Sequence, residues 1–185
     1  MKSFISEDNI EQTICKRLSL PEYGWARIEC NPDVSAQDEV GSTGRANSSE
    51  CILPVIFLNA LKRINPQVDE EILRGIVSEF RKDYTATDMV DTNYRFYNQI
   101  RNGINVKVKN NGKEDFEIVK LIDFDNVENN DFHCVNQMWI KGRFRYRRPD
   151  VLLFVNGLPV VFIELKNSTV KVEESYNKNL VTMVR

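Results

Sequence analysis

The chain has 185 residues, enough for one domain with its own core, and its composition (42% hydrophobic, 28% charged) is that of an ordinary globular protein. No apolar run approaches the ~20 residues of a membrane helix, and the acidic start lacks the apolar core of a signal peptide. The formal net charge of −2 does not indicate nucleic-acid binding, although basic residues can still gather in one place.

Cysteine and histidine are too scattered for several kinds of site. The cysteines form no CxxC pair, so we expect reduced thiols of a cytosolic protein, partly filling the core: Cys15, Cys30, Cys51 and Cys134. The single histidine, His133, cannot complete a zinc site of normal spacing. It would also have to be the sole base of a Ser-His-Asp or Cys-His enzyme, so we interpret it as a surface or half-buried strand residue.

The first half of the chain is predicted to be mainly helical. Ser6, followed by Glu7 and Asp8, predicts a capped helix that runs to about Leu18. The next segments are predicted as a turn at 21–24, a strand at 25–30, a long loop rich in Ser, Asp, Asn and Gly at 31–50, and helices at 52–64, 69–84 and 92–102.

The pattern changes to strands after Gly103. Alternating residues predict a hairpin of 104–108 with 116–122, then a strand at 132–140, and a last pair at 151–155 and 160–165 around Asn156-Gly157. A helix is expected beyond residue 170. Helices first and strands later indicate an α+β fold, with a mixed β-sheet core flanked by helices.

Three ionisable residues stand at one end of the last strand pair. Asp150 begins the first strand, and Glu164 and Lys166 end the second; the apolar residues between them predict a fully buried hairpin. Two carboxylates and the backbone carbonyl of Leu165 are the hard oxygen ligands that Mg²⁺ prefers. Lys166 can orient a water or stabilise charge on a phosphorane-like transition state. The sequence therefore predicts Mg²⁺-dependent phosphodiester cleavage; the alternative is solvated strand-end charges beside an ordinary turn.

The turn at Asn156-Gly157 decides which face Asp150 takes. A regular two-residue loop would place Asp150 opposite Ile163, on the wrong face from Glu164. We predict either a three-residue loop with Gly157 in the left-handed region or a compensating bulge elsewhere in the hairpin.

The order Pro149-Asp150, then Glu164-Leu165-Lys166, resembles the PD-(D/E)xK nuclease motif. More narrowly, residues 148–167 resemble the N-terminal nuclease domain of the restriction (R) subunit of type I restriction–modification enzymes. So do Asn130-Asp131-Phe132, Asn136-Gln137 and the opening helix followed by Tyr23-Gly24. The likeness spans essentially the whole chain. It implies a PD-(D/E)xK restriction-endonuclease-like fold (α/β/α-like) in which Asp150, Glu164 and Lys166 are catalytic.

The resemblance also implies properties beyond these residues. Family members are large ATP-dependent motors that translocate double-stranded DNA and cut it far from their recognition site, in a complex with methylation and specificity subunits. The chain has no G-x-x-x-x-G-K-[ST] phosphate loop, so we expect ATP to bind outside it. The 185 residues are then one endonuclease domain of a prokaryotic, cytoplasmic type I site-specific deoxyribonuclease, the N-terminal fragment of a longer subunit with its last helix truncated.

Two features match the family pattern less closely: Glu11 in the first helix, and the segment that follows Lys166. Glu11 lies on a helix stripe with Ile14 and Cys15, where an acid is unexpected. A first-helix Glu supports the metal site in many nucleases of this class, whereas the alternative is a stripe-edge carboxylate that reaches solvent. Many relatives also carry Q-x-x-x-Y after the lysine, and the corresponding positions here are Lys178 and Thr182.

Basic residues fall at every second position just before Asp150: Lys141, Arg143, Arg145 and Arg147. On a strand, this spacing puts all four on one face and the intervening aromatics on the other. We expect a DNA-binding stripe that tracks phosphates and leads the duplex to the Asp150 end of the hairpin. The alternative is a solvated strand face.

Two other functions stay open. A catalytically inactive DNA-binding or docking module would keep the fold, but the intact Asp, Glu and Lys set argues against it, and a metal-dependent nicking assay separates the two. A PD-(D/E)xK nuclease of DNA repair, or a standalone homing-type enzyme, shares the motif. A motor encoded directly after residue 185 would favour the restriction subunit.

Overall fold

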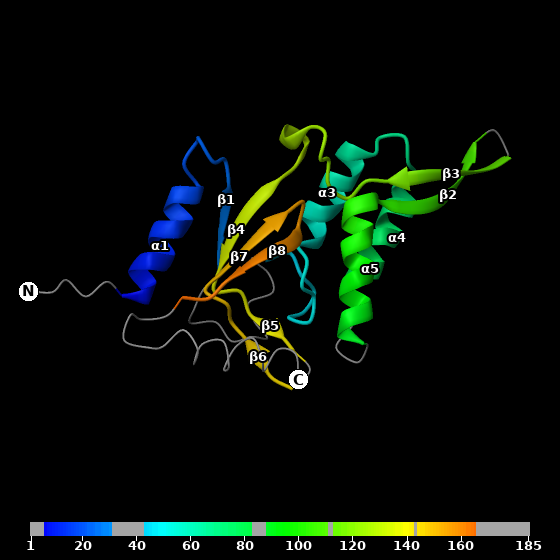
Figure 1. Ribbon diagram of the computed structural model, residues 1–185. Coiled ribbons are helices and arrows are strands. Elements are labelled where there is room, and N and C mark those ends of the chain that lie inside the picture. Colours follow the sequence, from blue (N-terminus) through cyan, green and yellow to red (C-terminus); the bar gives the residue numbers. More distant parts are fainter. Residues whose placement is uncertain (1–5, 31–42, 83–87, 111–112, 143, 166–185) are drawn as a thin grey trace, which may run out of the picture.

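The computed structural model describes residues 6–30, 43–82, 88–110, 113–142 and 144–165 (Figure 1). Its elements are α1 (Glu7–Leu18), β1 (Ala26–Glu29), α3 (Pro54–Ile64), α4 (Glu70–Phe80), α5 (Met89–Asn102), β2 (Ile104–Asn110), β3 (Lys113–Val119), a 3-10 turn (Val127–Asn129), β4 (Phe132–Asn136), β5 (Ile140–Lys141), β6 (Tyr146–Arg147), β7 (Val151–Val155) and β8 (Leu158–Ile163). The predicted α+β class is confirmed. No helix within these ranges has the length and apolar character to cross a membrane.

A four-stranded mixed sheet in the order β1-β4-β7-β8 forms the centre. β1 runs parallel to β4, and the β4–β7 and β7–β8 pairs are antiparallel. One face packs against α1 in a cluster that includes Cys15, Cys134, Val151 and Leu153. The other face packs against the start of α3 in a cluster that includes Leu53, Val135, Leu152 and Phe154. Because side chains alternate along a strand, β7 is covered on both faces, and the predicted sheet flanked by helices is confirmed.

The remaining helices and the β2–β3 hairpin form a second layer around α3. Figure 1 shows α3, α4 and α5 grouped at the β8 side of the sheet, while α1 lies at the β1 side. Phe57 of α3, Phe80 of α4 and Phe96 of α5 form successive ring contacts in this cluster. Helix α5 begins three residues before its predicted start because the Asp88 side chain caps it, accepting the backbone N–H groups of Val90 and Asp91.

Three predicted strand features are wrong. The strand expected at 132–140 ends at Asn136, because Gln137 has a positive φ of 59° and turns the backbone out of the sheet. The last strand begins at Leu158 and not at residue 160, since Val155 already pairs with Leu158. The hairpin is not fully buried either: β8 is an edge strand, and within the described residues Val160, Val161 and Phe162 are 36–44% exposed.

The Asn156-Gly157 turn is held by a buried polar network. The Asn156 side chain accepts the backbone N–H of Asp131 (2.7 Å) and donates to the carbonyl of Leu121 (3.0 Å) and to Asn130 Oδ1 (2.8 Å). The Gly157 carbonyl accepts the backbone N–H of Leu53, at the start of α3. These contacts tie the turn to two distant segments, so the position of the whole β7–β8 hairpin is set at its turn.

Part of the predicted 31–50 loop is anchored to the domain; residues 31–42 lie outside the described residues. Arg45 is buried and donates to the carbonyls of Glu50 (3.0 Å) and Trp139 (2.9 Å). The Ser48 carbonyl accepts the backbone N–H of Lys141 (2.8 Å). This segment therefore supports the start of the β5–β6 hairpin.

Candidate active site at the end of the β7–β8 hairpin

A β-bulge sets the relation between Asp150 and Glu164. The ladder starts with Val155 opposite Leu158, shifts between Leu153 and Phe154, and ends with Val151 opposite Ile163. Continued by one residue, this register puts Asp150 opposite Glu164; without the shift, Asp150 would face Ile163. The predicted three-residue loop is wrong, because the turn has two residues with φ of 52° and 78°. The predicted alternative, a compensating bulge elsewhere in the hairpin, is confirmed.

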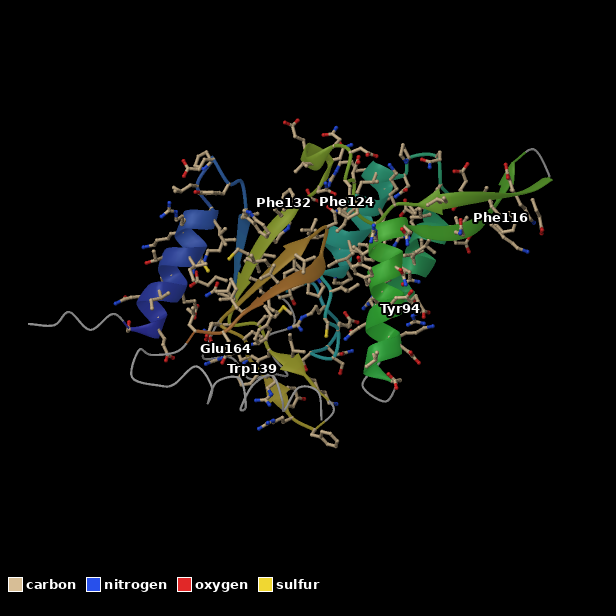
Figure 2. The ribbon with its side chains drawn as sticks, viewed as in Figure 1. Tyr94, Phe116, Phe124, Phe132, Trp139 and Glu164 are labelled. Atoms are coloured by element: carbon tan, nitrogen blue, oxygen red, sulfur yellow. The ribbon has the colours of Figure 1, made fainter. Side chains whose placement is uncertain are left out.

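Asp150 is held by two backbone contacts at this end of the sheet. Its Oδ2 accepts the backbone N–H of Leu165 at 2.6 Å, and its carbonyl accepts the backbone N–H of Gln137 at 3.0 Å. Asp150, Glu164 and Leu165 are all half-buried. Figure 2 shows Glu164 where β8 ends, at the same end of the sheet as Trp139. Asp150 and the Leu165 peptide therefore meet at the end of the hairpin, and Glu164 stands between the last residue of β8 and Leu165, while Lys166 lies outside the described residues.

Glu11 is 4% exposed, so the alternative of a stripe-edge carboxylate that reaches solvent is wrong. Its Oε1 accepts the side-chain amide of Asn136 (2.9 Å), and its Oε2 accepts that of Gln137 (2.5 Å). Asn136 Oδ1 is buried with no hydrogen-bond partner among the described residues. A buried acceptor without a donor is costly, so it marks a place where water or a cation would be stabilised.

Glu11 and Asp150 line one pocket of about 440 Å³. Its wall carries five carboxylates and one arginine: Glu7, Asp8, Glu11, Glu29, Asp150 and Arg148; it is completed by Gln12, Cys30, Asn136 and Gln137. Such a wall has a negative field, which repels a phosphate unless a cation lies between them.

The site offers few side-chain ligands, which suits Mg²⁺ better than a metal ion that is coordinated only by protein side chains. Among the described residues, no three His, Cys, Asp or Glu side chains are grouped so that they could hold a metal ion. Mg²⁺ usually keeps several waters and uses one or two carboxylates. Asp150 and Glu164, with the Leu165 carbonyl, fit that requirement. Both oxygens of Glu11 are already engaged by amides, which favours a supporting role for this residue.

The four predicted DNA-binding cations do not share one strand face. The chain reverses between β5 and β6, where the backbone N–H of Gly142 donates to the Arg145 carbonyl (2.9 Å). Lys141 pairs with Tyr146, and Arg147 pairs with Ile140. Since cross-strand partners share a face and neighbours alternate, Lys141 and Arg147 point to opposite faces. The expectation of a single face is therefore wrong, and Arg143 lies outside the described residues.

Arg147, on β6, lies within electrostatic range of Glu164. Burial lowers the pKa of the Arg147 guanidinium, and the positive charge of Arg145 lowers it further, while the negative charge of Glu164 acts in the opposite direction. Lys141 and Arg145 are exposed, and Arg147 is half-buried. Of these cations, Arg147 is the one that lies close enough to Glu164 to feel its charge.

Sequence reasoning assigned no role to three residues of this site. Arg148 lines the pocket, and its guanidinium lies 5.1 Å from the centre of the Trp139 ring. Asn136 and Gln137 connect Glu11 to the end of β4, and Gln137 also reaches the backbone of Asp150. Their position in the segments that carry the family resemblance was the only available signal. It did not show that they meet Glu11.

Comparison with known proteins gives a consistent result. The family described as type I restriction enzyme R protein N terminus matches residues 4–183. The chain is 34% identical over 164 residues to the type I restriction enzyme HindI endonuclease subunit of Haemophilus influenzae, covering 88% of this chain and 15% of that protein. It is 33% identical over 147 residues to the putative type I restriction enzyme MjaIXP endonuclease subunit of Methanocaldococcus jannaschii, covering 75% and 14%. The chain therefore spans only about one seventh of the length of these relatives.

Proposed function

The chain belongs to the family of type I restriction enzyme R protein N termini, and we propose that it is the Mg²⁺-dependent endonuclease domain of such an enzyme, hydrolysing phosphodiester bonds in double-stranded DNA. The observation that carries the proposal is the bulge whose register sets Asp150 opposite Glu164, at the end of a buried strand. We further propose that the sheet and its helices form a PD-(D/E)xK fold. The helices on both faces of a mixed sheet support this assignment.

The metal-binding residues proposed are Asp150 and Glu164, with the Leu165 carbonyl. Bound Mg²⁺ would neutralise the phosphate, stabilise the leaving oxygen and acidify the attacking water. The acidic pocket wall supports the proposal because, without a cation, it would repel DNA.

The other side chains have distinct proposed tasks. Lys166 orients the attacking water or stabilises charge that develops on the phosphate. Glu11 holds Asn136 and Gln137 in place, and the Gln137 backbone N–H in turn holds the Asp150 backbone. Glu11 therefore acts on the metal site through its neighbours, as a positioning residue. Lys141, Arg143, Arg145 and Arg147 provide positive charge for the DNA backbone.

The remaining parts of the enzyme are proposed from family membership alone. The printed names of the relatives are those of endonuclease subunits, and most of their length lies outside the match. We propose that an ATP-driven motor is encoded with this domain, and that methylation and specificity subunits complete the complex. In this arrangement, target recognition resides in another subunit and the domain needs only sequence-independent DNA contacts.

The test is nicking of supercoiled plasmid, measured for the 185-residue chain and for the complete subunit in its complex. We expect nicking with Mg²⁺, none with EDTA, and none for Asp150→Ala in either buffer. DNA binding that persists in the complete complex without metal-dependent nicking would identify an inactive docking module instead.

A further inference from the structure

Two cysteines far apart in the chain meet between α1 and the sheet. Cys15 on α1 and Cys134 on β4 have their sulfur atoms 3.4 Å apart, and both are fully buried. They pack with Val151 and Leu153 of β7. Both are free thiols in the structure. A disulfide requires a sulfur–sulfur distance of about 2.0 Å, so closing the bond needs an approach of about 1.4 Å.

We propose that Cys15 and Cys134 form an oxidation site, in which a hydroperoxide converts the two thiols into a disulfide that ties α1 to β4. The geometry selects this pair among the four cysteines. Cys30 is buried in the cluster on the opposite face of the sheet, and Cys51 is exposed and belongs to neither cluster. Disulfides of cytosolic proteins, where they form, are usually transient and redox-sensing.

The two thiols differ in reactivity. The hydrogen bond from Cys134 lowers the pKa of Cys15, whereas the same contact, together with burial, raises the pKa of Cys134. The contact therefore favours the thiolate form at Cys15 over that at Cys134, so Cys15 is the sulfur that attacks, since the thiolate is the nucleophilic form of cysteine. The exposed Cys51 competes for oxidant, and α1 must open locally to admit the peroxide to the buried pair.

The chemistry balances with hydrogen peroxide as the oxidant. The Cys15 thiolate attacks one peroxide oxygen, the O–O bond breaks, and the products are a sulfenic acid and hydroxide, which takes a proton to become water. The Cys134 sulfur then attacks the Cys15 sulfur, the S–O bond breaks, and the hydroxyl leaves as water with the Cys134 proton. Two thiols are oxidised by two electrons, and one peroxide is reduced to two waters.

The cross-link would hold two walls of the acidic pocket together. Glu11 lies one turn before Cys15 on α1, and Asn136 lies two residues after Cys134 on β4; these two residues are already hydrogen-bonded. Oxidation would therefore stop α1 from lifting off the sheet. The expected signature is slower amide exchange throughout α1.

The test uses the 185-residue chain with Cys51→Ser, which removes the exposed competitor. After treatment with hydrogen peroxide, free thiols are alkylated under denaturing conditions and the protein is digested for mass spectrometry. We expect a peptide pair linked through Cys15 and Cys134, reversed by dithiothreitol, with α1 amides exchanging at least tenfold more slowly before reduction. A matched Cys30→Ser variant in the same background should keep the link.

Three outcomes would overturn the proposal: recovery of Cys15 and Cys134 as alkylated thiols, their oxidation to separate sulfinic acids, or a link that uses Cys30. Cys134→Ala should abolish the link. Because this variant can also lose stability, peptide mapping of the chain that keeps both cysteines decides the question independently.

Discussion

The carboxylate of Asp150 accepts the backbone N–H of Leu165 at a distance of 2.6 Å. This contact lies one step beyond the last ladder pair, Val151 with Ile163, so it continues the strand pairing through a side chain. The residue that precedes β7 is thereby tied to the peptide that follows Glu164. The charge of Asp150 and its hydrogen bond can be separated by substitution.

Asp150→Asn should keep an oxygen acceptor for Leu165 but lose the negative charge. We expect DNA cleavage to fall by at least ~10²-fold, with the free energy of unfolding changed by less than about 1 kcal/mol. Asp150→Ala loses the acceptor too, and should cost about 1 kcal/mol more. Cleavage assays and urea unfolding measure the two effects. Wild-type cleavage by Asp150→Asn would show that no metal depends on this carboxylate.

Lys166→Ala should abolish cleavage in the complete enzyme while ATP hydrolysis and translocation stay close to wild type. The reason is that the proposed nuclease site and the proposed motor occupy different parts of the subunit. Parallel ATPase and cleavage assays on one preparation test it. Loss of both activities together would indicate that the position is structural.

Glu11 substitutions should separate packing from charge. Glu11→Ala leaves the amide donors of Asn136 and Gln137 without their acceptor, which costs about 1–3 kcal/mol. Glu11→Gln should cost less than about 1 kcal/mol, because a flipped Asn136 amide can offer its unpartnered Oδ1 to the new NH₂ group.

The same Glu11→Gln variant tests the supporting role in catalysis. Residues that orient metal ligands typically change metal affinity by roughly 10–100-fold when replaced. We therefore expect a higher Mg²⁺ concentration for half-maximal cleavage, at nearly unchanged stability. An unchanged Mg²⁺ dependence would limit Glu11 to packing.

Gly157→Ala should destabilise the domain more than Gly24→Ala. Both glycines have positive φ (78° and 68°), so either substitution strains the backbone by roughly 1–2 kcal/mol. A Cβ at Gly157 would also lie 2.6 Å from the Leu53 carbonyl oxygen and 2.9 Å from the Phe57 nitrogen, whereas a Cβ at Gly24 meets nothing within 4 Å. Urea unfolding of the two variants gives the comparison; equal losses would mean that the turn can move away from α3.

The four basic residues Lys141, Arg143, Arg145 and Arg147 should strengthen DNA binding equally for duplexes of unrelated sequence. Replacing Arg143 and Arg145 together with Ala should reduce the slope of log affinity against log salt by roughly one to two units on unrelated duplexes. Lys141→Ala and Arg147→Ala form a matched pair because these side chains point to opposite faces. If the duplex follows one face, only one of them should change the slope, by about 0.9. If the slope is unchanged in every variant while stability is preserved, these residues are solvated surface charges that do not contact DNA.

Sequence alone determined the features that depend on neighbouring residues. The Ser6 cap and the apolar spacing predicted α1 to within a residue, and alternation predicted the β2–β3 hairpin. The Asn156-Gly157 turn is a local signal too, and it placed Asp150 and Glu164 at the same end of one hairpin. In each case the chain segment that carries the signal also forms the structure.

Only the tertiary structure decided which of these segments meet, and in what register. Pro159 stands next to the residue of β8 that the register shift leaves unpaired, and a proline inside a strand is typical of an edge strand or a bulge, but it does not by itself fix the register that sets Asp150 opposite Glu164. The turn is docked on α3 and bound through Asn156 to residues 121–131, and these contacts fix where the ladder begins. The alternating basic residues of 141–147 indicated one continuous strand, but the chain turns after Lys141 and forms two antiparallel strands instead. The partners of Glu11 and of Cys15 lie more than 100 residues away, and periodicity within a helix shows that a side chain faces inward without showing what it contacts there.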